Sequence, residues 1–420
     1  MSNAQDHHLS GMKFIEGGTF TLNRNLMTSI EENIDTTYLY YSNVKRTTPS
    51  NFYLSNHEVT NSEYWEFIKW VQDSVTRKYL FEGSTWDKKA LWGYYVDYKT
   101  YNVDTLGRYF ILNWDTPLNY YSYSNYPILK PIINSNYGNF SQFNENFIDE
   151  DRLAYCYEFP DTELESGAYS LVDVFPNTTW PESFQYGFYD NSENYFKSKI
   201  YQSYPVVGIS YLQAKAYCHW RSKQFKNNYE ALSSEQKKYF SINSYFRLPT
   251  ETEWERGARG DLDLSQYPWG GPYIRNAAGC FLANFKPLRG RYFEDGGFHT
   301  VKVYSYNPNA FGLYCMAGNV AEWCSTTFDE SMYEFGHDMS GEYDYQAQDG
   351  DPAVKKRKVI RGGSWKDIGY YLMNSTRTYE YQDTAKSYIG FRNVMTHLGR
   401  GGKDIDQENG EEIQSDIQLK

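Results

Sequence analysis

Short segments in which apolar residues alternate with small or polar ones predict the first strands of this chain. Such alternation is typical of a strand with one buried face. It occurs first in residues 11–22, around Gly17 and Gly18, where we expect a β-hairpin with the two glycines at its turn. It occurs again in residues 52–59, where we expect a single strand.

Three helices are predicted from capping boxes, in which a serine or threonine is followed three residues later by Glu or Gln. The three pairs are Thr60 with Glu63, Ser210 with Gln213, and Thr250 with Glu253. After the first box, apolar residues recur at helical spacing, at Tyr64, Phe67, Ile68, Val71 and Val75. Each box follows an expected strand, in residues 52–59, 205–209 and 245–249. Strands that alternate with capped helices in this way favour an α+β domain.

Further elements are expected toward the C-terminus. A short charged helix is predicted in residues 233–239, and buried strands are predicted in residues 359–365 and 388–394. The basic run 355–358 follows an acidic loop, residues 344–351, so it is either a solvated face or half of an intramolecular charge pair.

The stretch between residues 78 and 204 is a long insertion. It is rich in Tyr, Asn, Asp and Phe and shows no sustained period, so we expect loops and short strands. A structureless loop of this length would be implausible. We therefore expect one domain in residues 11–398, preceded by a tag or linker in residues 1–10. An acidic flexible tail is expected in residues 399–420.

Residues 311–326, FGLYCMAGNVAEWCST, hold the most suggestive chemistry. Gly318 and Asn319 allow positive φ angles, so that several carbonyl groups can point the same way. The carboxylate of Glu322 could then close a cage of oxygens around a hard cation such as calcium. The alternative is a tight turn in which Trp323 belongs to the core and Glu322 caps a backbone amide.

Composition restricts the classes of partner. The 420 residues are 40% hydrophobic and 19% aromatic, which is enough to build a sizeable core. A formal net charge of −12 argues against nucleic acid or an anionic membrane as the main partner. No apolar run reaches a transmembrane length and no signal peptide is recognisable. The opening Met-Ser-Asn-Ala is typical of a vector-derived remnant, so we expect that a native export signal has been cut away.

The cysteines fit neither a disulfide framework nor a zinc site, because they are odd in number and show no CxxC pair. They are Cys156, Cys218, Cys280, Cys315 and Cys324. Cys315 and Cys324 flank the central turn, and the sequence leaves open whether they are bonded or free.

Seven ordered blocks resemble the formylglycine-generating enzyme (sulfatase-modifying factor) family. They are IEGGTF, FYLSNHEVTNSEYWEFI, YPVVGISYLQAKAYCHW, FRLPTETEWERGARG, GLYCMAGNVAEW, VIRGGSW and GFR. They cover most of the chain outside the insertion and the tail. The resemblance implies an α+β, modified C-type-lectin-like fold with little regular secondary structure.

The same resemblance implies that the family's oxidase chemistry is lost here. The enzyme uses a copper-binding pair of cysteines after the GGS strand, three residues beyond the serine and five residues further on. Those positions are Asp367 and Leu372 in this sequence. Neither supplies the thiolate sulfur that Cu(I) requires, and no cysteine follows Cys324.

Two structural calcium sites are also implied by the resemblance. The first would use the side chains of Asn284 and Asp295 with the carbonyl oxygens of Phe285 and Gly297. The second would use the Glu322 side chain with carbonyl oxygens, those of Gly318 and Val320. Both sets retain their oxygen donors, so we expect calcium and no copper.

Within the family, several blocks look like the GldK/PorK subgroup of gliding-motility and type IX secretion lipoproteins. They include YPWGGPY, RGRYFEDGGF, KRKVIRGGSWKD and TRTYEYQDTAKSYIGFR. This likeness implies a non-catalytic subunit of a ring at the periplasmic face of the outer membrane, with a GldN/PorN-like partner. The lipid-bearing cysteine of the subgroup is absent from this sequence, so the expected membrane anchor is missing from it.

Two other functions remain open. The chain could be a residual formylglycine-generating oxidase with another metal arrangement, or a lectin-like module that binds glycan or peptide. Under the scaffold interpretation, the aromatic clusters 92–95 and 120–126 are candidates for contacts between subunits. The alternative for these rings is burial within the insertion itself.

Overall fold

A computed structural model describes most of the chain, in two compact units. The described residues are 11–23, 44–97, 108–120, 122–133, 150–158, 169–177, 192–234, 236–262, 265–287, 297–332 and 343–397. The first unit comprises residues 1–61, 177–188 and 203–420, and the second comprises residues 62–176 and 189–202. The expected linker 1–10 and tail 399–420 lie outside the described residues.

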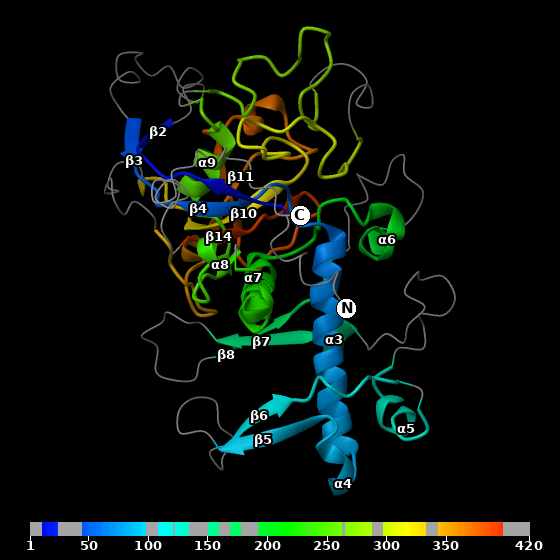
Figure 1. Cartoon of the computed structure of the whole chain (residues 1–420). Coiled ribbons are helices and arrows are strands. Elements are labelled where there is room, and N and C mark those ends of the chain that lie inside the picture. The colour runs from blue at the N-terminus through cyan, green and yellow to red at the C-terminus, as the bar shows by residue number, and fades with distance from the viewer. Residues whose placement is uncertain are drawn as a thin grey trace. The chain divides into compact units, whose positions relative to one another are not determined.

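The first unit contains a four-stranded sheet that joins distant parts of the chain (Figure 1). Its strands, in spatial order, are β1 (Met12–Ile15), β4 (Phe52–Ser55), β14 (Val394–Thr396) and β9 (Phe246–Arg247). All three pairings are antiparallel. The last described strand therefore lies between two strands that precede it in the sequence.

The predicted hairpin in residues 11–22 is wrong. β1 pairs with β4, whereas β2 (Phe20–Asn23) pairs with β3 (Val44–Thr47) in a separate ribbon. The two glycines lie against a neighbouring segment instead of forming a hairpin turn. The amide of Gly18 donates to the Pro49 carbonyl oxygen at 3.2 Å, and an added Cβ at Gly17 would lie 2.3 Å from that oxygen. Close backbone approach, and not a turn, explains the glycine at position 17.

A second four-stranded sheet holds the central stretch. Its spatial order is β12 (Arg377–Tyr381), β11 (Arg357–Arg361), β10 (Ala321–Thr327) and β13 (Ile389–Gly390). β10 and β13 are parallel, and the other pairs are antiparallel. The predicted strand 359–365 is thus β11, shifted toward the N-terminus. It ends before Gly362 and Gly363, which have φ angles of 88° and 65°. Positive φ at two consecutive residues ends the extended backbone.

Two of the predicted capping boxes are confirmed. In α7 (Tyr211–Asn228) the Ser210 side chain accepts from Gln213 N–H, and the Gln213 side chain accepts from Ser210 N–H. In α9 (Glu251–Arg259) Thr250 and Glu253 make the same reciprocal pair. Shorter helical segments of this unit are η4 (Tyr229–Ala231), α8 (Gln236–Tyr239), η5 (Ala353–Lys356) and η6 (Gly369–Leu372).

Four further predicted strands differ in extent from the structure, and the first of these, 52–59, ends at Ser55 as β4. The expected strand 205–209 is buried but forms only an isolated bridge, between Thr60 and Pro205. Residues 388–394 are divided between β13 and the start of β14, which belong to different sheets. Only Phe246 and Arg247 are extended in the expected strand 245–249. The apolar pattern reported burial correctly in these segments, but burial alone does not make a strand.

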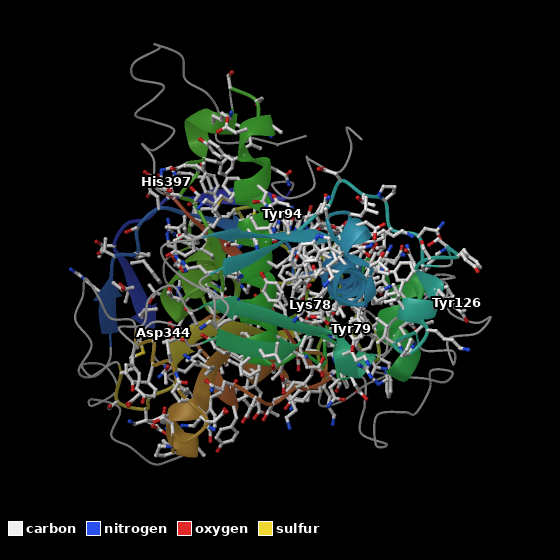
Figure 2. The ribbon with its side chains drawn as sticks, turned by 90° about the horizontal axis from the view of Figure 1, so that it is seen from below. Lys78, Tyr79, Tyr94, Tyr126, Asp344 and His397 are labelled. Atoms are coloured by element: carbon white, nitrogen blue, oxygen red, sulfur yellow. The ribbon has the colours of Figure 1, made fainter. Side chains whose placement is uncertain are left out.

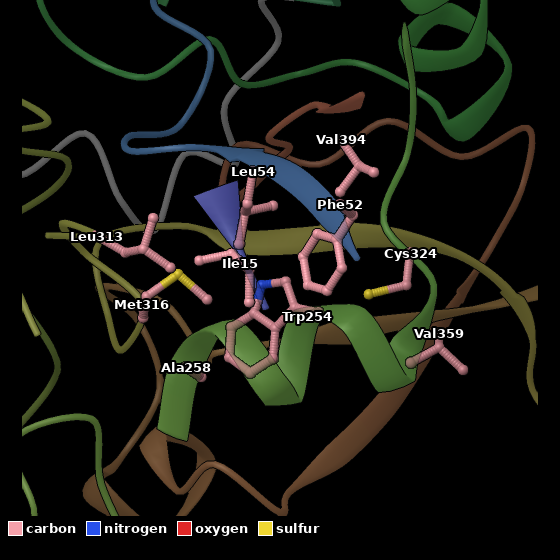
Figure 3. Close-up of a cluster of buried hydrophobic side chains, with 10 residues drawn as sticks. All are labelled: Ile15, Phe52, Leu54, Trp254, Ala258, Leu313, Met316, Cys324, Val359 and Val394. Atoms are coloured by element: carbon pink, nitrogen blue, oxygen red, sulfur yellow. The ribbon is translucent and has the colours of Figure 1, made fainter. Parts of the chain in front are cut away.

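A hydrophobic core cluster of the first unit is built from both sheets and α9 (Figure 3). Trp254 of α9 is fully buried and lies among side chains of β1, β4, β10, β11 and β14. These are Ile15, Phe52, Leu54, Cys324, Val359 and Val394. A Cβ added to Gly257, one turn along α9, would lie 2.6 Å from Leu54 Cδ2. The helix therefore packs as closely as its small residues allow.

The second unit is organised on α3 (Asn61–Gly83), the long blue helix of Figure 1. The predicted apolar face is confirmed at Tyr64, Phe67, Ile68 and Val71, which are buried, whereas Val75 is only half-buried. The insertion contributes two antiparallel hairpins, β5 (Gly93–Asp97) with β6 (Arg108–Leu112) and β7 (Ala154–Glu158) with β8 (Tyr169–Asp173). It also contributes α4 (Trp86–Lys89), α5 (Tyr126–Leu129), η1 (Glu150–Arg152), α6 (Ser192–Lys197) and η3 (Lys199–Tyr201).

Aromatic rings of the insertion divide between core and surface. Trp92 is buried, whereas Tyr94 and Tyr126 are exposed (Figure 2). Tyr120 hydrogen bonds to Asp73 of α3 at 3.2 Å, and Tyr123 is fully exposed. Each of the two aromatic clusters therefore contains both inward and outward rings. No helix among the described residues is long and apolar enough to cross a membrane.

Candidate functional site

The turn at Gly318 and Asn319 places a buried polar group at the centre of the first unit. Both residues have positive φ, 75° and 63°, as the sequence predicts. An added Cβ at Gly318 would lie 2.4 Å from the Asn284 carbonyl oxygen, so only glycine fits there. The fully buried Asn319 side chain accepts from Val301 N–H at 2.9 Å. Its amide nitrogen donates to both carboxyl oxygens of Glu58, at 3.0 and 3.1 Å.

Glu322 forms a buried ion pair with Arg392. Arg392 Nε lies 2.6 Å from Glu322 Oε2, and Arg392 Nη2 lies 2.7 Å from Glu322 Oε1. The Trp254 indole N–H also donates to Oε2, at 2.7 Å. The remaining Arg392 nitrogen donates to the Ser55 carbonyl oxygen. A bidentate pair with further hydrogen bonds is the arrangement that offsets the cost of desolvating two charges.

Glu58 is the second carboxyl group of this buried site. Burial raises its pKa well above the usual range, and the nearby Glu322 carboxylate raises it further. Arg392 and the Asn319 amide act in the opposite direction but do not prevail. The site therefore favours the protonated form of Glu58 more than water does, because one guanidinium group does not balance two buried carboxylates.

The calcium sets that the resemblance implies are described only in part. Asn284 is buried, and its amide nitrogen donates to the His299 carbonyl oxygen at 2.6 Å, which leaves the amide oxygen as the available acceptor. Phe285 lies in a hydrophobic cluster, and Gly297 adjoins residues 299–301. Asp295 lies outside the described residues. In this set, the Asn284 amide oxygen is the described group that could ligate a cation.

The residues of the second expected calcium site, around Glu322, have a different environment. Each oxygen of Glu322 accepts an N–H donor, and Arg392 supplies the neutralising charge. The amide of Gly318 donates to Gly362, and the backbone amide of Val320 hydrogen bonds to Glu58. Calcium at Glu322 stays a prediction that these contacts do not support. Among the described residues, no three His, Cys, Asp or Glu side chains gather as a metal site.

The two positions that correspond to the enzyme's cysteines are occupied by structural side chains. Leu372 of η6 is fully buried among Tyr267, Phe285 and Met373. Asp367 accepts a hydrogen bond from the Ser364 hydroxyl at 2.6 Å, and burial raises the pKa of its carboxyl. These positions now serve packing and a local turn.

The described cysteines are single thiols. Cys218, Cys315 and Cys324 are buried, Cys280 is exposed, and none of these four forms a disulfide. Burial raises the pKa of Cys218 to about 12. Burial also raises that of Cys315, and the charge of Glu58 adds to this effect. The open question about Cys315 and Cys324 is thus answered: they are not bonded to each other.

A second buried charge network joins α9 to β11 and β12. Arg259 Nη2 lies 2.6 Å from Glu255 Oε1, and Arg361 bonds to the other oxygen of the same carboxylate. Arg377 contacts Glu251 at 2.8 and 2.9 Å. Sequence reasoning missed this network and the role of Arg392. The available signal was a charged residue at an inward position of an otherwise apolar block.

The basic run 355–358 is part of an intramolecular set of charge pairs, one of the two expected alternatives. The buried Lys358 ammonium lies 2.7 Å from Asp344 Oδ1, and Asp344 is labelled in Figure 2. Arg357 pairs with Glu330 at 2.7 Å, and Lys356 donates to the Asp349 carbonyl oxygen. This run is therefore not an unpaired basic surface for a polyanion.

Comparison with known proteins gives one family and a set of partial relatives. A family model described as sulfatase-modifying factor enzyme 1-like domain matches residues 1–397. An inactive C-alpha-formylglycine-generating enzyme 2 of Bos taurus is 34% identical over 45% of this chain and 49% of its own length. A formylglycine-generating enzyme of Thermomonospora curvata is 30% identical over 45% of this chain and 55% of its own. The chain thus spans about half the length of these curated relatives.

Among solved structures, PvdO from Pseudomonas aeruginosa is similar to this chain at 16% identity and a TM-score of 0.46. The match covers 92% of this chain and 94% of PvdO. Relatives named as inactive and relatives named as enzymes are similar to the chain to nearly the same degree. The comparisons alone therefore do not distinguish a catalytic from a non-catalytic member.

Proposed function

This chain belongs to the sulfatase-modifying factor enzyme 1-like domain family, and we propose that it is a non-catalytic structural subunit of a secretion machinery. Its fold is that of the formylglycine-generating enzymes, α+β with little regular secondary structure, as the resemblance implied. The machinery we propose is the type IX secretion and gliding system, because several blocks of the sequence resemble those of GldK/PorK. The proposed location of the protein is the periplasmic face of the outer membrane, where a lipid anchor would hold it.

The proposal that the protein is non-catalytic rests on Asp367 and Leu372, at the two positions where the family resemblance expects cysteines. Leu372 is a core residue, and Asp367 is hydrogen bonded to Ser364. Copper(I) is bound by soft sulfur ligands, and a carboxylate and an isobutyl group cannot replace two thiolates. The buried cysteines do not form a substitute pair, since each described thiol is single and burial disfavours the thiolate at Cys218 and Cys315.

Rigidity supports the scaffold part of the proposal. The buried pairs Glu322–Arg392 and Glu255–Arg361 connect residues that are 70 and 106 positions apart. Removing one partner of such a pair leaves an uncompensated charge in the interior, so the elements are held in one arrangement. The second unit adds exposed rings, Trp86, Tyr94 and Tyr123, of the type that protein interfaces use.

The direct test is co-expression of this chain with its GldN/PorN-like neighbour, followed by affinity purification and negative-stain imaging. We expect the two proteins to co-purify and to form closed rings. A chain that stays alone in the presence of the neighbour would overturn the proposal. The matched control is an active formylglycine-generating enzyme, which should not retain the neighbour under the same conditions.

The oxidase alternative has its own assay. A sulfatase-motif peptide is incubated with the protein and copper, and its mass is followed. We expect no loss of the peptide cysteine, whereas the active enzyme used as control converts it. Conversion by this chain would refute the non-catalytic assignment even if rings form.

We also propose a structural calcium ion at Asn284, Asp295 and the carbonyl oxygens of Phe285 and Gly297. It would tie two loops of the first unit through oxygen ligands. Calcium should raise the midpoint of thermal unfolding relative to chelator, because an ion that binds only the folded state stabilises it. The variant Asp295→Asn should lose most of this shift. An equal shift in the variant and the parent chain would reject the site.

A further inference from the structure

Arg357, the first residue of β11, holds an exposed carboxylate in the fork of its guanidinium group. Its Nη1 lies 2.7 Å from Glu330 Oε1, and its Nη2 lies 3.1 Å from Glu330 Oε2. Two parallel hydrogen bonds are the geometry in which a guanidinium group recognises a carboxylate. The Glu330 side chain is 67% exposed, whereas that of Arg357 is only 12% exposed. The Glu330 carboxylate therefore covers the fork and lies itself largely in water.

Contacts other than Glu330 hold the guanidinium group in place. Its Nε donates to the Val354 carbonyl oxygen at 3.1 Å. The guanidinium carbon lies 5.2 Å from the centre of the Phe328 ring and 4.9 Å from that of the Tyr379 ring. These two rings also contact each other, with centres 4.7 Å apart. The fork therefore keeps its orientation when the carboxylate leaves, which lowers the entropic cost of binding another one.

Release of Glu330 from the fork has a small cost. An ion pair with one side chain largely in water shifts an equilibrium by at most about five-fold. The hydrogen bond from Arg357 lowers the pKa of the Glu330 carboxyl, so this group is ionised at neutral pH. Exchange of Glu330 for a second carboxylate therefore leaves the charge of the site unchanged.

Exposed apolar side chains lie beside the fork. They are Val354 and the rings of Tyr379 and Tyr381. Tyr381 is the partner of Arg357 in the register of β11 and β12, and its ring meets that of Tyr379 edge to face. Rings that combine an apolar body with a hydroxyl group are enriched at protein interfaces. The surface beside the fork therefore suits an apolar residue that adjoins a carboxylate.

We propose that Arg357 is a binding site for an acidic side chain of a partner protein, and that Glu330 is its internal stand-in. An aspartate or glutamate of the partner displaces Glu330 from the fork. An apolar residue next to it in the partner packs on Val354, Tyr379 and Tyr381. Glu330 moves into water, so one carboxylate replaces another.

The surroundings of the fork favour a single acidic side chain over a polyanion. Lys358 pairs with Asp344, and the Lys356 ammonium donates to the Asp349 carbonyl oxygen. These neighbouring cations are engaged within the chain, whereas the partner of Arg357 is an exposed side chain. The formal net charge of −12 opposes an acidic ligand only weakly, because charges are screened beyond about 8 Å at physiological salt.

Selection from a phage-displayed library of random peptides tests the ligand class. Immobilised full-length Glu330→Ala is the bait, because its fork is uncovered, and phage that also bind Arg357→Lys are discarded. Lysine keeps the charge but presents no planar fork. We expect the retained peptides to carry Asp or Glu next to an aromatic or aliphatic residue. A retained set without acidic residues, or no retained peptide at all, overturns the proposal.

Fluorescence anisotropy with one retained peptide, labelled and amidated at its C-terminus, measures the exchange. Glu330→Ala should bind this peptide about two- to five-fold more tightly than the parent chain, because the stand-in no longer competes. A twin peptide with an amide in place of the acidic side chain should bind Glu330→Ala at least about ten-fold more weakly, because a charge-assisted pair is lost. Circular dichroism checks that the variants fold.

Glu230→Ala is the matched control for Glu330→Ala. Glu230 is also exposed, and its Oε2 lies 3.1 Å from the ammonium of Lys237, which lies 5.4 Å from the centre of the Tyr229 ring. Its removal uncovers a single ammonium instead of a fork, so peptide affinity should equal that of the parent chain. Equal affinities of the parent and Glu330→Ala, or the same gain in Glu230→Ala, would overturn the proposal.

The site is independent of the proposed scaffold role, because it belongs to the first unit and requires no ring. Failure of the peptide tests with retained binding of the GldN/PorN-like neighbour rejects this inference alone. Failure of neighbour binding with the expected peptide affinities rejects the scaffold role alone.

Discussion

Arg392 neutralises Glu322 through two parallel hydrogen bonds, at 2.6 and 2.7 Å, in the fully buried centre of the first unit. The two residues come from different parts of the fold, since Glu322 is in strand β10 and Arg392 is in the segment between β13 and β14. Arg392 also donates to the carbonyl oxygens of Ser55 and Tyr314. The pair is thus a junction between four segments of chain, and its loss should destabilise the folded protein.

The first prediction concerns this junction. Glu322→Gln should lower the free energy of unfolding by about 3–5 kcal/mol, because it leaves Arg392 buried without its counter-charge. Urea denaturation measures the change. The control Glu330→Gln removes the exposed partner of Arg357 and should cost at most about 1 kcal/mol. Similar losses in both variants would contradict the special role of the buried pair.

A second measurement on the same variant is the shift that calcium causes in its unfolding midpoint. If Arg392 is the only cation at Glu322, then calcium should raise the unfolding midpoint of Glu322→Gln by as much as that of the parent chain. If calcium binds Glu322, as the family resemblance implies, the variant should lose part of that shift.

The second prediction concerns the pH dependence of stability. The folded-state pKa of Glu58 is raised by burial and by Glu322, so in the folded protein this group holds a proton that the unfolded chain has released. Its stabilising contribution is present below the unfolded pKa of about 4.3 and is lost as pH rises toward the folded pKa.

The variant Glu58→Gln isolates this contribution. As pH rises above the unfolded pKa, the free energy of unfolding of the parent should fall relative to the variant, by at most about 1.4 kcal/mol per pH unit. Parallel pH profiles for the two proteins would show that Glu58 is ionised in the folded state. Denaturant titrations at matched ionic strength give the comparison.

The third prediction concerns thiol reactivity. In the native protein, iodoacetamide should modify Cys280 rapidly, because it is exposed. Cys218, Cys315 and Cys324 should react only on unfolding, because burial excludes the reagent and, at Cys218, raises the pKa to about 12. Peptide mass spectrometry assigns the sites, and Cys280→Ser is the control. Native labelling of Cys315 or Cys324 would indicate a more open centre than the one described.

The fourth prediction concerns Leu372, which stands where the enzyme pattern has a cysteine. Leu372→Ala should cost about 2–5 kcal/mol, because it opens a cavity in a filled cluster. The matched control is Leu171→Ala at an exposed position of β8, which should change stability by less than about 0.5 kcal/mol. A small effect at Leu372 would mean that the position tolerates the loss of volume and remains adaptable.

Local signals predicted local structure well. The capping boxes at Ser210 and Thr250 identify the starts of α7 and α9, because each box involves only residues three apart. The positive φ of Gly318 and Asn319 was also predictable, since both residue types tolerate that conformation. The apolar face of α3 follows directly from helical spacing.

Pairings between distant segments were not predictable in the same way. The alternation in residues 11–22 is typical of a hairpin, yet β1 and β2 pair with different strands, and Gly17 between them donates to the Asn51 side chain, 34 positions away. For the Glu322–Arg392 pair, the local pattern shows at most a charged residue at an inward position and does not identify its partner. The two residues are 70 positions apart, and only the fold brings them together.

The position of β14 has a consequence for biosynthesis. β4 and β9 both pair with β14, which ends at Thr396, so the first sheet cannot be completed until nearly the whole described chain has been synthesised. An incomplete nascent chain exposes the edges of β4 and β9, which are then available for wrong pairing. A folding helper that covers nascent strand edges would therefore have to stay bound until the last strand is released.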